Sequence, residues 1–296
     1  MKSLFDLILR SLFILLFFPL SASANDWLWA GYEIVGYKTV TRAQIESQIS
    51  IPIGSKFTTD FQKWDEICKN IRSSFDFYET RCSAVRYVDF KAYFVIDIVE
   101  RSDEQRVRFR EAPTKNIELA SPQILDLYEQ LYQRIQYMFD QGIAFHENHT
   151  NGYLDYDDKQ LSQMCAQLAE LVPPFHDNLL DVLQNDADPE KRAKAANLLN
   201  WARRAEEDVI SSAKLLDDPD GNVRNNISRF AQAFVGYVQS SEARKNLYDA
   251  FLIQLMRPSH GDRNKALYSM LNSVSQFPDD VAYLKQKGLC EIRLIA

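Results

Sequence analysis

The amino-acid sequence predicts two parts with different folds, an α+β unit over residues 25–101 and an all-α region over residues 121–296. Two capping-box tetrapeptides, each followed by apolar residues at helical spacing, predict a pair of helices in the first part. Two runs of β-forming residues after them predict its last two strands. Beyond residue 157, short amphipathic segments separated by prolines predict a succession of helices. The expected order is therefore β-α-α-β-β, followed by helices alone.

The first part begins with a strand and two helices. Residues Trp29 to Lys38 are apolar and rich in β-forming types, which indicates a strand. Thr41 and Thr59 each start a capping box, in which the hydroxyl caps the third backbone N–H and a glutamine returns to the cap. Gly54 separates the two helices. The second helix has an apolar stripe at spacings of three and four residues, formed by Phe61, Trp64, Cys68, Ile71 and Phe75.

Two strands follow, over residues 79–88 and 90–100. Alternate side chains of a strand point to opposite faces of the sheet. In the last strand, the face formed by Phe94, Ile96 and Ile98 carries no charge and is expected to meet the helices. The opposite face carries one aspartate and is otherwise quite apolar. Either the all-α region of the same chain or an external partner could cover it.

Residues 31–101 also carry several short motifs in a defined order. The motifs are Ile34-Val35-Gly36 before a hydroxyl-capped helix, Gly54 and Phe57 ahead of the second helix, and Val99-Glu100 at the end of the last strand. Together they resemble a POTRA domain, the polypeptide-transport-associated module of outer-membrane assembly and secretion proteins. This chain departs from the family at Tyr37, where the family often has asparagine, and in having one copy. The resemblance implies two helices on a three-stranded sheet that binds extended peptides at a sheet edge.

The resemblance makes residues 79–88 an edge strand. An exposed edge offers unpaired backbone N–H and C=O groups, to which another chain can add as a strand. Arg81 and Arg86 lie in this strand, and charged residues on an edge often prevent aggregation instead, so both interpretations stay open. The candidate partner-binding residues are Arg81, Ser83, Val85 and Tyr87.

The N-terminal residues have the layout of a secretory signal peptide, predicted over residues 1–24. Lys2 and Arg10 precede an apolar run over residues 12–20, and small residues before Ala24 supply a cleavage site. The run is short for a membrane span, which needs ~20 residues, although an uncleaved anchor is the alternative. We therefore expect an exported mature chain that does not span a membrane. The POTRA resemblance implies a periplasmic or secreted protein of a double-membraned, Gram-negative-type bacterium.

Export would permit disulfide bonds between the cysteines. Cys68 is expected on the apolar stripe of the second helix and Cys82 in the neighbouring strand, so packing of the helix on the sheet could bring them within bonding range. Two buried thiols are the alternative. Cys165 and Cys290 are expected to fill helical core positions. No two cysteines have CxxC spacing, so the sequence gives no support for a zinc or thioredoxin-like site.

Residues 102–120 are dense in charge, contain a proline and show no apolar period, which predicts a linker. The helices after it contain a repeat, visible in DADPEKRAKAANLL, DDPDGNVRNNISRFA and SHGDRNKALYSML. Over about residues 174–290 this pattern resembles HEAT repeats, which implies a curved solenoid of stacked helix pairs. An aspartate in each turn would cap the next helix, and an arginine would bind a turn carboxylate of its own or a neighbouring repeat. The residues with this structural role are Asp188, Arg192, Asp220, Arg224 and Arg263; in the third copy Asp262 and Arg263 lack the usual spacing.

The strongest candidate for chemistry is the segment over residues 145–158. Its His146, His149, Asp155 and Asp157 are residue types that bind zinc or another transition metal. Their spacing does not match the HExxH motif of metalloproteases, and the composition is typical of a loop. The chain has no phosphate-binding loop, dinucleotide fingerprint or serine-hydrolase elbow, so the sequence predicts neither a cofactor nor a catalytic residue.

The distribution of charge indicates which partners are suitable. The net charge is −7, and the residues up to Lys115 carry 16 basic and 15 acidic side chains, so the excess acid lies in the all-α region. Nucleic-acid binding needs a basic face, and nucleic acid is therefore not expected as a partner. The sequence predicts a non-enzymatic exported adaptor that binds one or more proteins in envelope protein transport, secretion or assembly. The alternative is a metal-dependent periplasmic enzyme that uses the His146–Asp158 loop.

Overall fold

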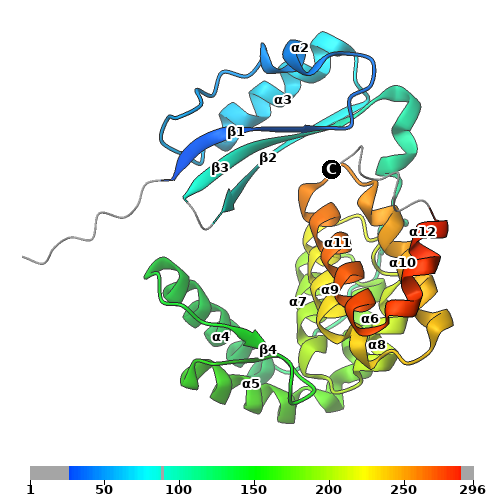
Figure 1. Ribbon diagram of the computed structural model, residues 1–296. Helices are drawn as coiled ribbons and strands as arrows, with labels where there is room; N and C mark the ends of the chain where they lie inside the picture. Colours follow the sequence, from blue (N-terminus) through cyan, green and yellow to red (C-terminus); the bar gives the residue numbers. More distant parts are fainter. Residues whose placement is uncertain (1–26, 88–89, 288–296) are drawn as a thin grey trace, which may run out of the picture. The chain divides into compact units, whose positions relative to one another are not determined.

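The computed structural model describes residues 27–87 and 90–287 (Figure 1). The chain divides after Arg101 into two compact units. We call the described residues up to Arg101 the sheet unit and those from Ser102 onward the helical unit. The predicted signal peptide and Cys290 lie outside the described residues, so the expectations for them remain predictions.

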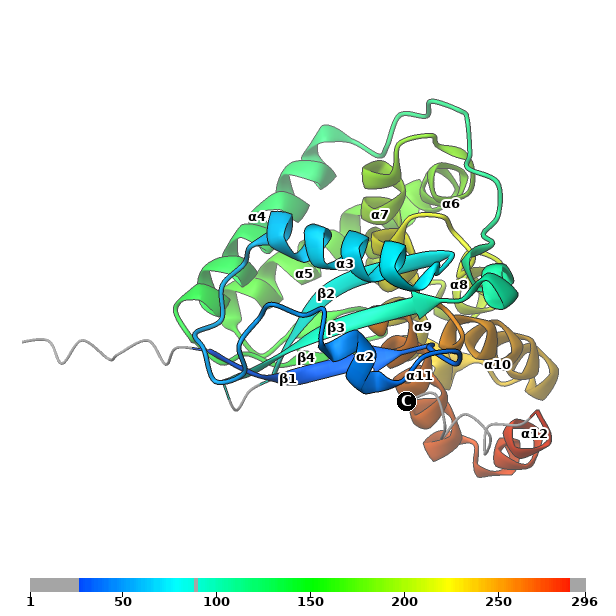
Figure 2. The same cartoon turned by 90° about the horizontal axis from the view of Figure 1, so that it is seen from above.

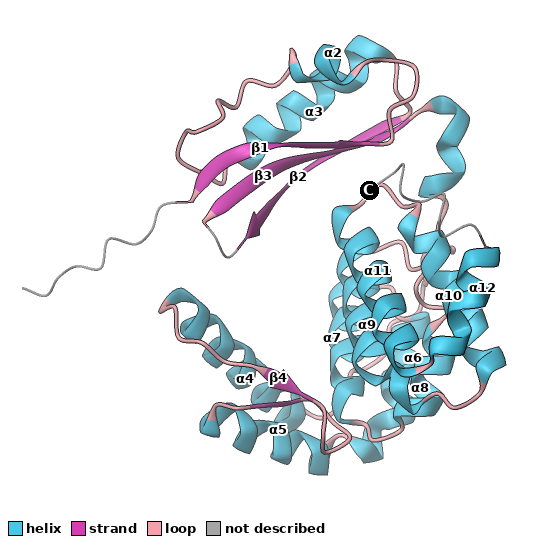
Figure 3. Ribbon diagram, in the orientation of Figure 1, coloured by secondary structure: helices cyan, strands magenta, loops and turns pink. Residues whose placement is uncertain are grey.

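The described part of the sheet unit contains three strands and two α-helices. They are β1 (Leu28–Val35), α2 (Arg42–Glu46), α3 (Phe61–Phe75), β2 (Glu79–Tyr87) and β3 (Lys91–Val99). β3 lies between the other two strands, parallel to β1 and antiparallel to β2. Both helices cover the same face of this sheet (Figures 2 and 3). The predicted α+β unit is confirmed.

The core of the sheet unit lies between the sheet and its helices. Phe94, Ile96 and Ile98 of β3 are fully buried on the face that was expected to meet the helices. The ring of Trp64 lies 5.9 Å from that of Phe94, and the ring of Trp29 lies 6.0 Å from each of them. These edge-to-face contacts fix how α3 packs across β1 and β3, because aromatic pairs prefer this geometry over a face-to-face stack.

The two helices of the sheet unit start with different caps. Thr41 forms the predicted capping box, since its hydroxyl accepts the Gln44 N–H and the Gln44 side chain accepts the Thr41 N–H. The predicted second capping box at Thr59 is wrong. α3 starts one residue later, where Asp60 accepts a backbone N–H at 3.0 Å, because aspartate is at least as strong a cap as threonine. Phe61, predicted on the buried stripe, is consequently 66% exposed.

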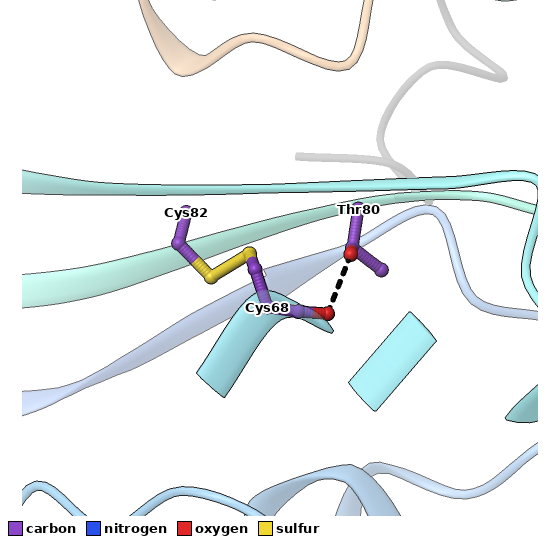
Figure 4. Close-up of a disulfide and its surroundings, with 3 residues drawn as sticks. All are labelled: Cys68, Thr80 and Cys82. Atoms are coloured by element: carbon purple, nitrogen blue, oxygen red, sulfur yellow. Dashed lines mark hydrogen bonds between the residues drawn. A yellow bond between two sulfur atoms is a disulfide. The ribbon is translucent and has the colours of Figure 1, made fainter. Parts of the chain in front are cut away.

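A disulfide bond joins Cys68 of α3 to Cys82 of β2, as the packing of a helix on a sheet predicted (Figure 4). The two Cα atoms are 5.9 Å apart, within the normal range for a disulfide. The hydroxyl of Thr80 also donates to the Cys68 carbonyl oxygen at 2.8 Å. The bond therefore attaches an outer strand of the sheet directly to the helix that covers it.

The helical unit consists mostly of short helices. Its α-helices are α4 (Pro122–Asp140), α5 (Lys159–Leu171), α6 (His176–Asn185), α7 (Pro189–Leu198), α8 (Ala205–Ser212), α9 (Gly221–Phe234), α10 (Ser241–Leu255), α11 (His260–Gln276) and α12 (Val281–Gln286). Its short 3₁₀ helices are η2 (Pro173–Phe175), η3 (Leu199–Trp201), η4 (Val235–Tyr237) and η5 (Pro278–Asp280), and η1 (Arg101–Val107) begins at the boundary of the two units. A two-stranded hairpin, β4 (Glu147–Asn148) and β5 (Asp155–Tyr156), separates α4 from α5.

Helices α7, α9 and α11 pack against one another in succession and are held together by buried ion pairs. Arg192 of α7 forms two hydrogen bonds with Asp218, at 2.9 and 3.0 Å, and Arg224 of α9 does the same with Asp262 of α11. Each arginine also donates to the two carbonyl oxygens five and six residues before it, at 2.8–3.2 Å. Arg244 of α10 repeats this arrangement with Asp280. We call these three pairs the arginine ladder.

The ladder shows which carboxylate each of these arginines binds. Asp188 and Asp220 cap α7 and α9 through their side chains, as expected. Each arginine binds a carboxylate beyond its own turn, which is one of the two possibilities that the sequence left open, and Asp262 pairs with Arg224 rather than with Arg263. Arg263 instead donates to the Arg257 carbonyl oxygen at 3.1 Å. In Arg192 and Arg224, the Nη1 atom donates to the carbonyl oxygens of the preceding turn. The Nε and Nη2 atoms therefore point away from that turn and donate to the more distant aspartate.

Residues 108–119, which belong to the predicted charged linker, are bound along the helical unit and form what we call the strap. Arg110 lies 2.5 Å from Asp218 of the ladder, and the Ile117 N–H donates to the Asp186 carboxylate at 2.6 Å. The ring of Phe109 lies 4.5 Å from the guanidinium of Arg224. The charge of Arg110 is therefore neutralised by a turn carboxylate, which the sequence pattern alone does not predict.

We predict that replacing both Cys68 and Cys82 by alanine lowers the free energy of unfolding by about 3 kcal/mol, because the bond no longer restricts the unfolded chain. Denaturant titration followed by tryptophan fluorescence measures the change. Reductant should destabilise the parent protein by a similar amount and leave the double variant unaffected. Equal stability of parent and double variant under oxidising conditions would contradict the prediction.

We predict that Arg224→Met lowers the free energy of unfolding by about 3–5 kcal/mol, because Asp262 is left as a buried charge without its partner. The double change Arg224→Met/Asp262→Leu should restore part of the loss. The control is Arg204→Met, which removes a pair with Glu207 at the surface and should cost less than about 1 kcal/mol. Chemical denaturation compares the three variants, and an equal loss in Arg204→Met and Arg224→Met would refute a special role for burial.

Candidate functional site

The outer side of β2 is the candidate partner-binding edge. The strand order leaves β1 and β2 at the two edges of the sheet. The edge of β1 is partly covered, because residues 54–57 form backbone hydrogen bonds of 2.7–2.9 Å with Trp27 and Trp29. In the part of the chain that the structure describes, no strand pairs with the outer side of β2. An edge of this kind is where a further strand can add.

The four residues predicted to bind a partner lie on one face of β2. The register places Arg81 opposite Asp97, Ser83 opposite Val95, Val85 opposite Tyr93, and Tyr87 opposite Lys91. Directly opposed residues of two strands share a face. The intervening residues Cys82 and Ala84 pack against the core under the helices. The predicted residues therefore share the face of the sheet away from the helices.

Two of these four side chains already have partners inside the sheet unit. The Nε atom of Arg81 lies 2.5 Å from Oε1 of Glu79. The Tyr87 hydroxyl donates to Oε1 of Glu33 at 3.1 Å. Such contacts hold polar groups close to the edge, where they hinder self-association of the sheet. A partner strand would therefore bind mainly to the backbone N–H and C=O groups of β2. The side chains of β2 would determine which partner sequences fit.

The helical unit contains a pocket of about 80 Å³ where α4, the β4–β5 hairpin, α7 and α9 meet. We call it the hairpin pocket. The sequence analysis did not find it, because its residues come from separate elements and share no local pattern. Its polar lining includes Tyr132, Glu147, His149, Tyr156, Asn197 and Arg229.

The charged side chains that line the hairpin pocket are Arg229 and Glu147. The Arg229 Nη2 atom lies 2.5 Å from Oε1 of Glu147. Lys265 of α11 is not among the lining residues, but both charges affect its pKa. Partial burial, reinforced by the charge of Arg229, lowers the pKa of Lys265, and Glu147 offsets this only in part. The two charged side chains of the lining therefore neutralise each other.

Neutral hydrogen-bonding groups surround these charges. Burial lowers the pKa of His149, whose ring packs edge-on against Phe234 with centroids 5.0 Å apart. Burial raises the pKa of Tyr156, so this phenol stays protonated and can donate. Asn197 donates to the Tyr132 hydroxyl oxygen at 2.8 Å. The Tyr132 hydroxyl is the acceptor in this bond, so its own hydrogen is not used in it. The pocket thus places neutral hydrogen-bonding groups around the Arg229–Glu147 pair.

The four candidate metal ligands are not brought to one centre. His146 forms two hydrogen bonds with Asp157, both at 2.8 Å, through its backbone N–H and its Nδ1 atom. Asp155 is buried and accepts the Tyr156 N–H at 2.8 Å, whereas His149 lines the hairpin pocket. Since the two histidines flank the short strand β4 at a separation of three residues, strand alternation turns them to opposite faces. Within the described residues, no group of three or more His, Cys, Asp or Glu side chains is arranged to hold a metal ion.

A buried histidine and aspartate form a pair that the sequence did not reveal, because they are 32 residues apart. Nε2 of His176 lies 2.6 Å from Asp208, and Nδ1 lies 3.0 Å from the exposed Asp177. Burial lowers the pKa of His176, but its bonds to the two carboxylates outweigh this and raise it overall. Burial also raises the pKa of Asp208, whose second oxygen has no hydrogen-bond partner in the described part of the chain. The pair therefore joins α6 to α8 through two buried groups that titrate.

Comparison with models of protein families, with curated proteins and with solved structures finds no match for this chain. The described helices include none with the length and apolar character that crossing a bilayer requires. The disulfide between Cys68 and Cys82 is compatible with an oxidising compartment outside the cytoplasm. The POTRA and HEAT resemblances therefore rest on the sequence motifs and on the coarse architecture, an α+β unit followed by a mostly helical one.

We predict that the stabilising contribution of His176 declines as pH rises from about 6.5 through its raised pKa. In that interval the folded protein binds the proton that the unfolded chain has lost, so the free energy of unfolding falls with pH. The slope is at most about 1.4 kcal/mol per pH unit for one proton. Denaturant titrations between pH 6 and 9 should show that His176→Asn flattens this dependence. Asp177→Asn, which leaves the buried partner in place, should flatten it less, and identical pH profiles for parent and His176→Asn would contradict the prediction.

Proposed function

We propose that this chain is a non-enzymatic exported scaffold that binds other proteins, with a role in envelope protein transport, secretion or assembly. The observation that carries the proposal is the outer edge of β2, nine residues long and unpaired by any strand that the structure describes. Strand addition at such an edge uses backbone hydrogen bonds for affinity and alternate side-chain positions for specificity. A partner segment in extended conformation is its natural ligand.

The disulfide supports the proposal through rigidity. An edge strand can fray when it lacks a second neighbour, and binding would then include the cost of ordering it. The bond between Cys68 and Cys82 and the hydrogen bond from Thr80 hold β2 on α3 before any partner arrives. The edge is therefore preorganised for binding. An oxidising compartment such as the periplasm would maintain this bond.

The helical unit supports the proposal through its construction. The HEAT resemblance implies a solenoid, and the successive contacts of α7 with α9 and of α9 with α11, joined by the arginine ladder, are compatible with stacking of each helix pair on its neighbours. Solenoids of this type present extended surfaces to protein partners. The sheet unit and the helical unit would then each bind a protein, which is the role of an adaptor.

The alternative, a metal-dependent enzyme that uses the His146–Asp158 loop, requires several ligands around one ion. His146 is engaged with Asp157, and His149 belongs to the hairpin pocket. No further observation favours this alternative. A stoichiometric metal ion in the purified full-length protein would revive it.

We predict that proline at one of the two neighbouring positions Ala84 and Val85 abolishes partner binding without unfolding the protein. Adjacent residues of an edge strand direct their N–H groups alternately toward the sheet and outward. Proline at the outward position removes a donor that only a partner would use, whereas proline at the inward position breaks the bond to β3. Cross-linking in the native envelope, with recovery of attached proteins, measures capture, and thermal unfolding measures stability.

The expected result is at least a tenfold loss of captured partner in the stable proline variant, since one lost hydrogen bond and a steric block exceed about 1.4 kcal/mol. Lys69→Ala, an exposed change on α3 of the same unit, is the control and should capture partners normally. If the stable proline variant captures the same proteins in the same amounts as the parent, β2 is not the docking edge.

A further inference from the structure

The hairpin pocket is lined by two nearly buried side chains whose oxygen atoms have no hydrogen-bond partner within the described residues. They are the hydroxyl of Tyr156 and the Oδ1 atom of Asn200. Both residues are only 6% exposed, so folding removed these groups from bulk water. Such groups are costly, because burial takes away the water molecules that they bind in the unfolded chain. A ligand that completes their hydrogen bonds would recover this cost.

The amide group of Asn200 is oriented by a hydrogen bond. Its Nδ2 atom donates to the backbone carbonyl oxygen of Asn197 at 2.8 Å, which assigns Oδ1 to the other branch of the amide. In the described part of the chain, neither this oxygen nor the Tyr156 hydroxyl is among the completely buried polar atoms that lack a partner. Each oxygen therefore keeps some accessible surface, and the pocket is the opening that the two residues share.

Two further side chains add unused groups to the lining. The ring of His149 packs on Phe234, and neither of its nitrogens forms a hydrogen bond with a described residue. A neutral imidazole offers one donor and one acceptor. The Nδ2 atom of Asn197 donates to the hydroxyls of Tyr128 and Tyr132, while its Oδ1 atom has no partner among the residues that the structure describes. The pocket therefore presents unused donors and unused acceptors together.

The charge of the lining favours a neutral ligand. Nη2 of Arg229 lies 2.5 Å from Oε1 of Glu147, so an anion would have to compete with Glu147 and a cation with Arg229. A carboxylate has no donor for the Asn200 oxygen, and an ammonium has no acceptor for the Tyr156 hydroxyl. A neutral group that both donates and accepts is therefore the best match.

A primary carboxamide has this set of groups. It carries two N–H donors and a carbonyl oxygen with two lone pairs, so it can form bonds with the Tyr156 hydroxyl and with the oxygens of Asn197 and Asn200 at once. A hydroxyl has one donor and would leave one of these two amide oxygens unpaired. The chemistry of the lining thus favours a carboxamide over an alcohol.

The size of the pocket indicates that the carboxamide belongs to a larger molecule. The pocket measures about 80 Å³, which exceeds the ~30 Å³ that one water molecule occupies in the liquid. Pockets that enclose a whole small-molecule ligand measure ~300–1,000 Å³. Tyr132, which also lines the pocket, is 39% exposed, and exposed tyrosines are enriched where proteins bind one another. A polypeptide is therefore the carrier that the surroundings favour.

We propose that the hairpin pocket binds the carboxamide of an asparagine or glutamine side chain of a polypeptide partner. The carboxamide oxygen accepts from the Tyr156 hydroxyl, and the carboxamide nitrogen donates to Oδ1 of Asn200. Asn197 and His149 take up the remaining donor and acceptor positions. The inference rests on the proposed scaffold function and gives the helical unit its own recognition chemistry.

NMR titration of the purified protein with hexapeptides tests the proposal. The chain has four histidines, so the ring signals of His149 can be assigned by substitution. Four peptides of otherwise identical glycine–serine sequence carry glutamine, asparagine, glutamate or methionine, and their ends are acetylated and methylamidated so that no other primary amide is present. The glutamine or the asparagine peptide should shift the His149 signals and bind at least tenfold more tightly than the glutamate and methionine peptides. Equal affinity of all four peptides, or no shift with either amide peptide, would overturn the proposal.

The hydroxyl of Tyr156 provides a variant that does not depend on stability. Because this hydroxyl has no partner within the described protein, Tyr156→Phe should not lower the thermal unfolding temperature, but it should weaken the amide peptides about fivefold. Tyr153→Phe is the control, since Tyr153 lies between β4 and β5 of the same hairpin and is not among the residues that line the pocket. It should bind the peptides as the parent does. Equal binding by Tyr156→Phe and the parent would contradict the proposed bond.

Two more probes separate other ligands from a polypeptide side chain. If free glutamine binds as tightly as the glutamine peptide, the pocket holds a free amide and the proposal is wrong. If methyl glucoside shifts the His149 signals and the amide peptides do not, the pocket recognises carbohydrate hydroxyls and the proposal is also wrong. These titrations follow the hairpin pocket, whereas the test of the scaffold function follows partner capture at β2. Failure of peptide binding would therefore leave the role of β2 untouched, and loss of capture at β2 would not affect the titrations.

Discussion

The helical unit depends on one recurrent interaction, the buried ion pair between an arginine of one helix and an aspartate in, or just before, a later helix. Taking both charges out of water costs several kcal/mol per ion, and the cost is recovered only where every donor finds an acceptor. Arg192 and Arg224 meet that condition by dividing their donors between a carboxylate and two turn carbonyls. The turn, the helix and the neighbouring helix are thus fixed by a single side chain. This geometry tolerates few alternatives, which favours one packing of the helices over others.

The strap extends the same network beyond the helices. Phe109 lies between the guanidinium groups of Arg224 and Arg257, 4.5 and 4.1 Å from their central carbon atoms. Arg110 adds a second cation to Asp218 of the ladder, so that carboxylate serves two arginines. Its pKa stays below the usual range because these bonds outweigh the effect of burial. A segment without regular structure is thereby ordered by groups that were already required for packing the helices.

The features that the sequence predicted are those set by neighbours along the chain. The cap at Thr41, the strand alternation around Phe94 and the meeting of Cys68 with Cys82 all follow from local periodicity. The sequence predicted the arginines of the ladder, because they recur. It did not predict their aspartate partners, which lie 26 residues from Arg192 and 38 residues from Arg224. The contacts of the strap could not be predicted, because a charged residue has the same sequence pattern whether it is solvated by water or bound to a group of the same chain. The hairpin pocket was missed because its lining comes from four elements that are far apart in sequence, and residue spacing carries no information about such convergence.

The disulfide has one more consequence, which concerns alignment rather than stability. A strand paired on one side only can slide along its neighbour, and a shift by one residue exchanges the side chains on its two faces. Anchoring Cys82 to a helix prevents this shift of β2, because the sulfur atom can face only α3. A chain that adds to the outer edge of β2 would therefore pair with a strand that has only one register. The disulfide would in this way determine which side chains of the added strand lie on each face of the sheet, although it contacts none of them.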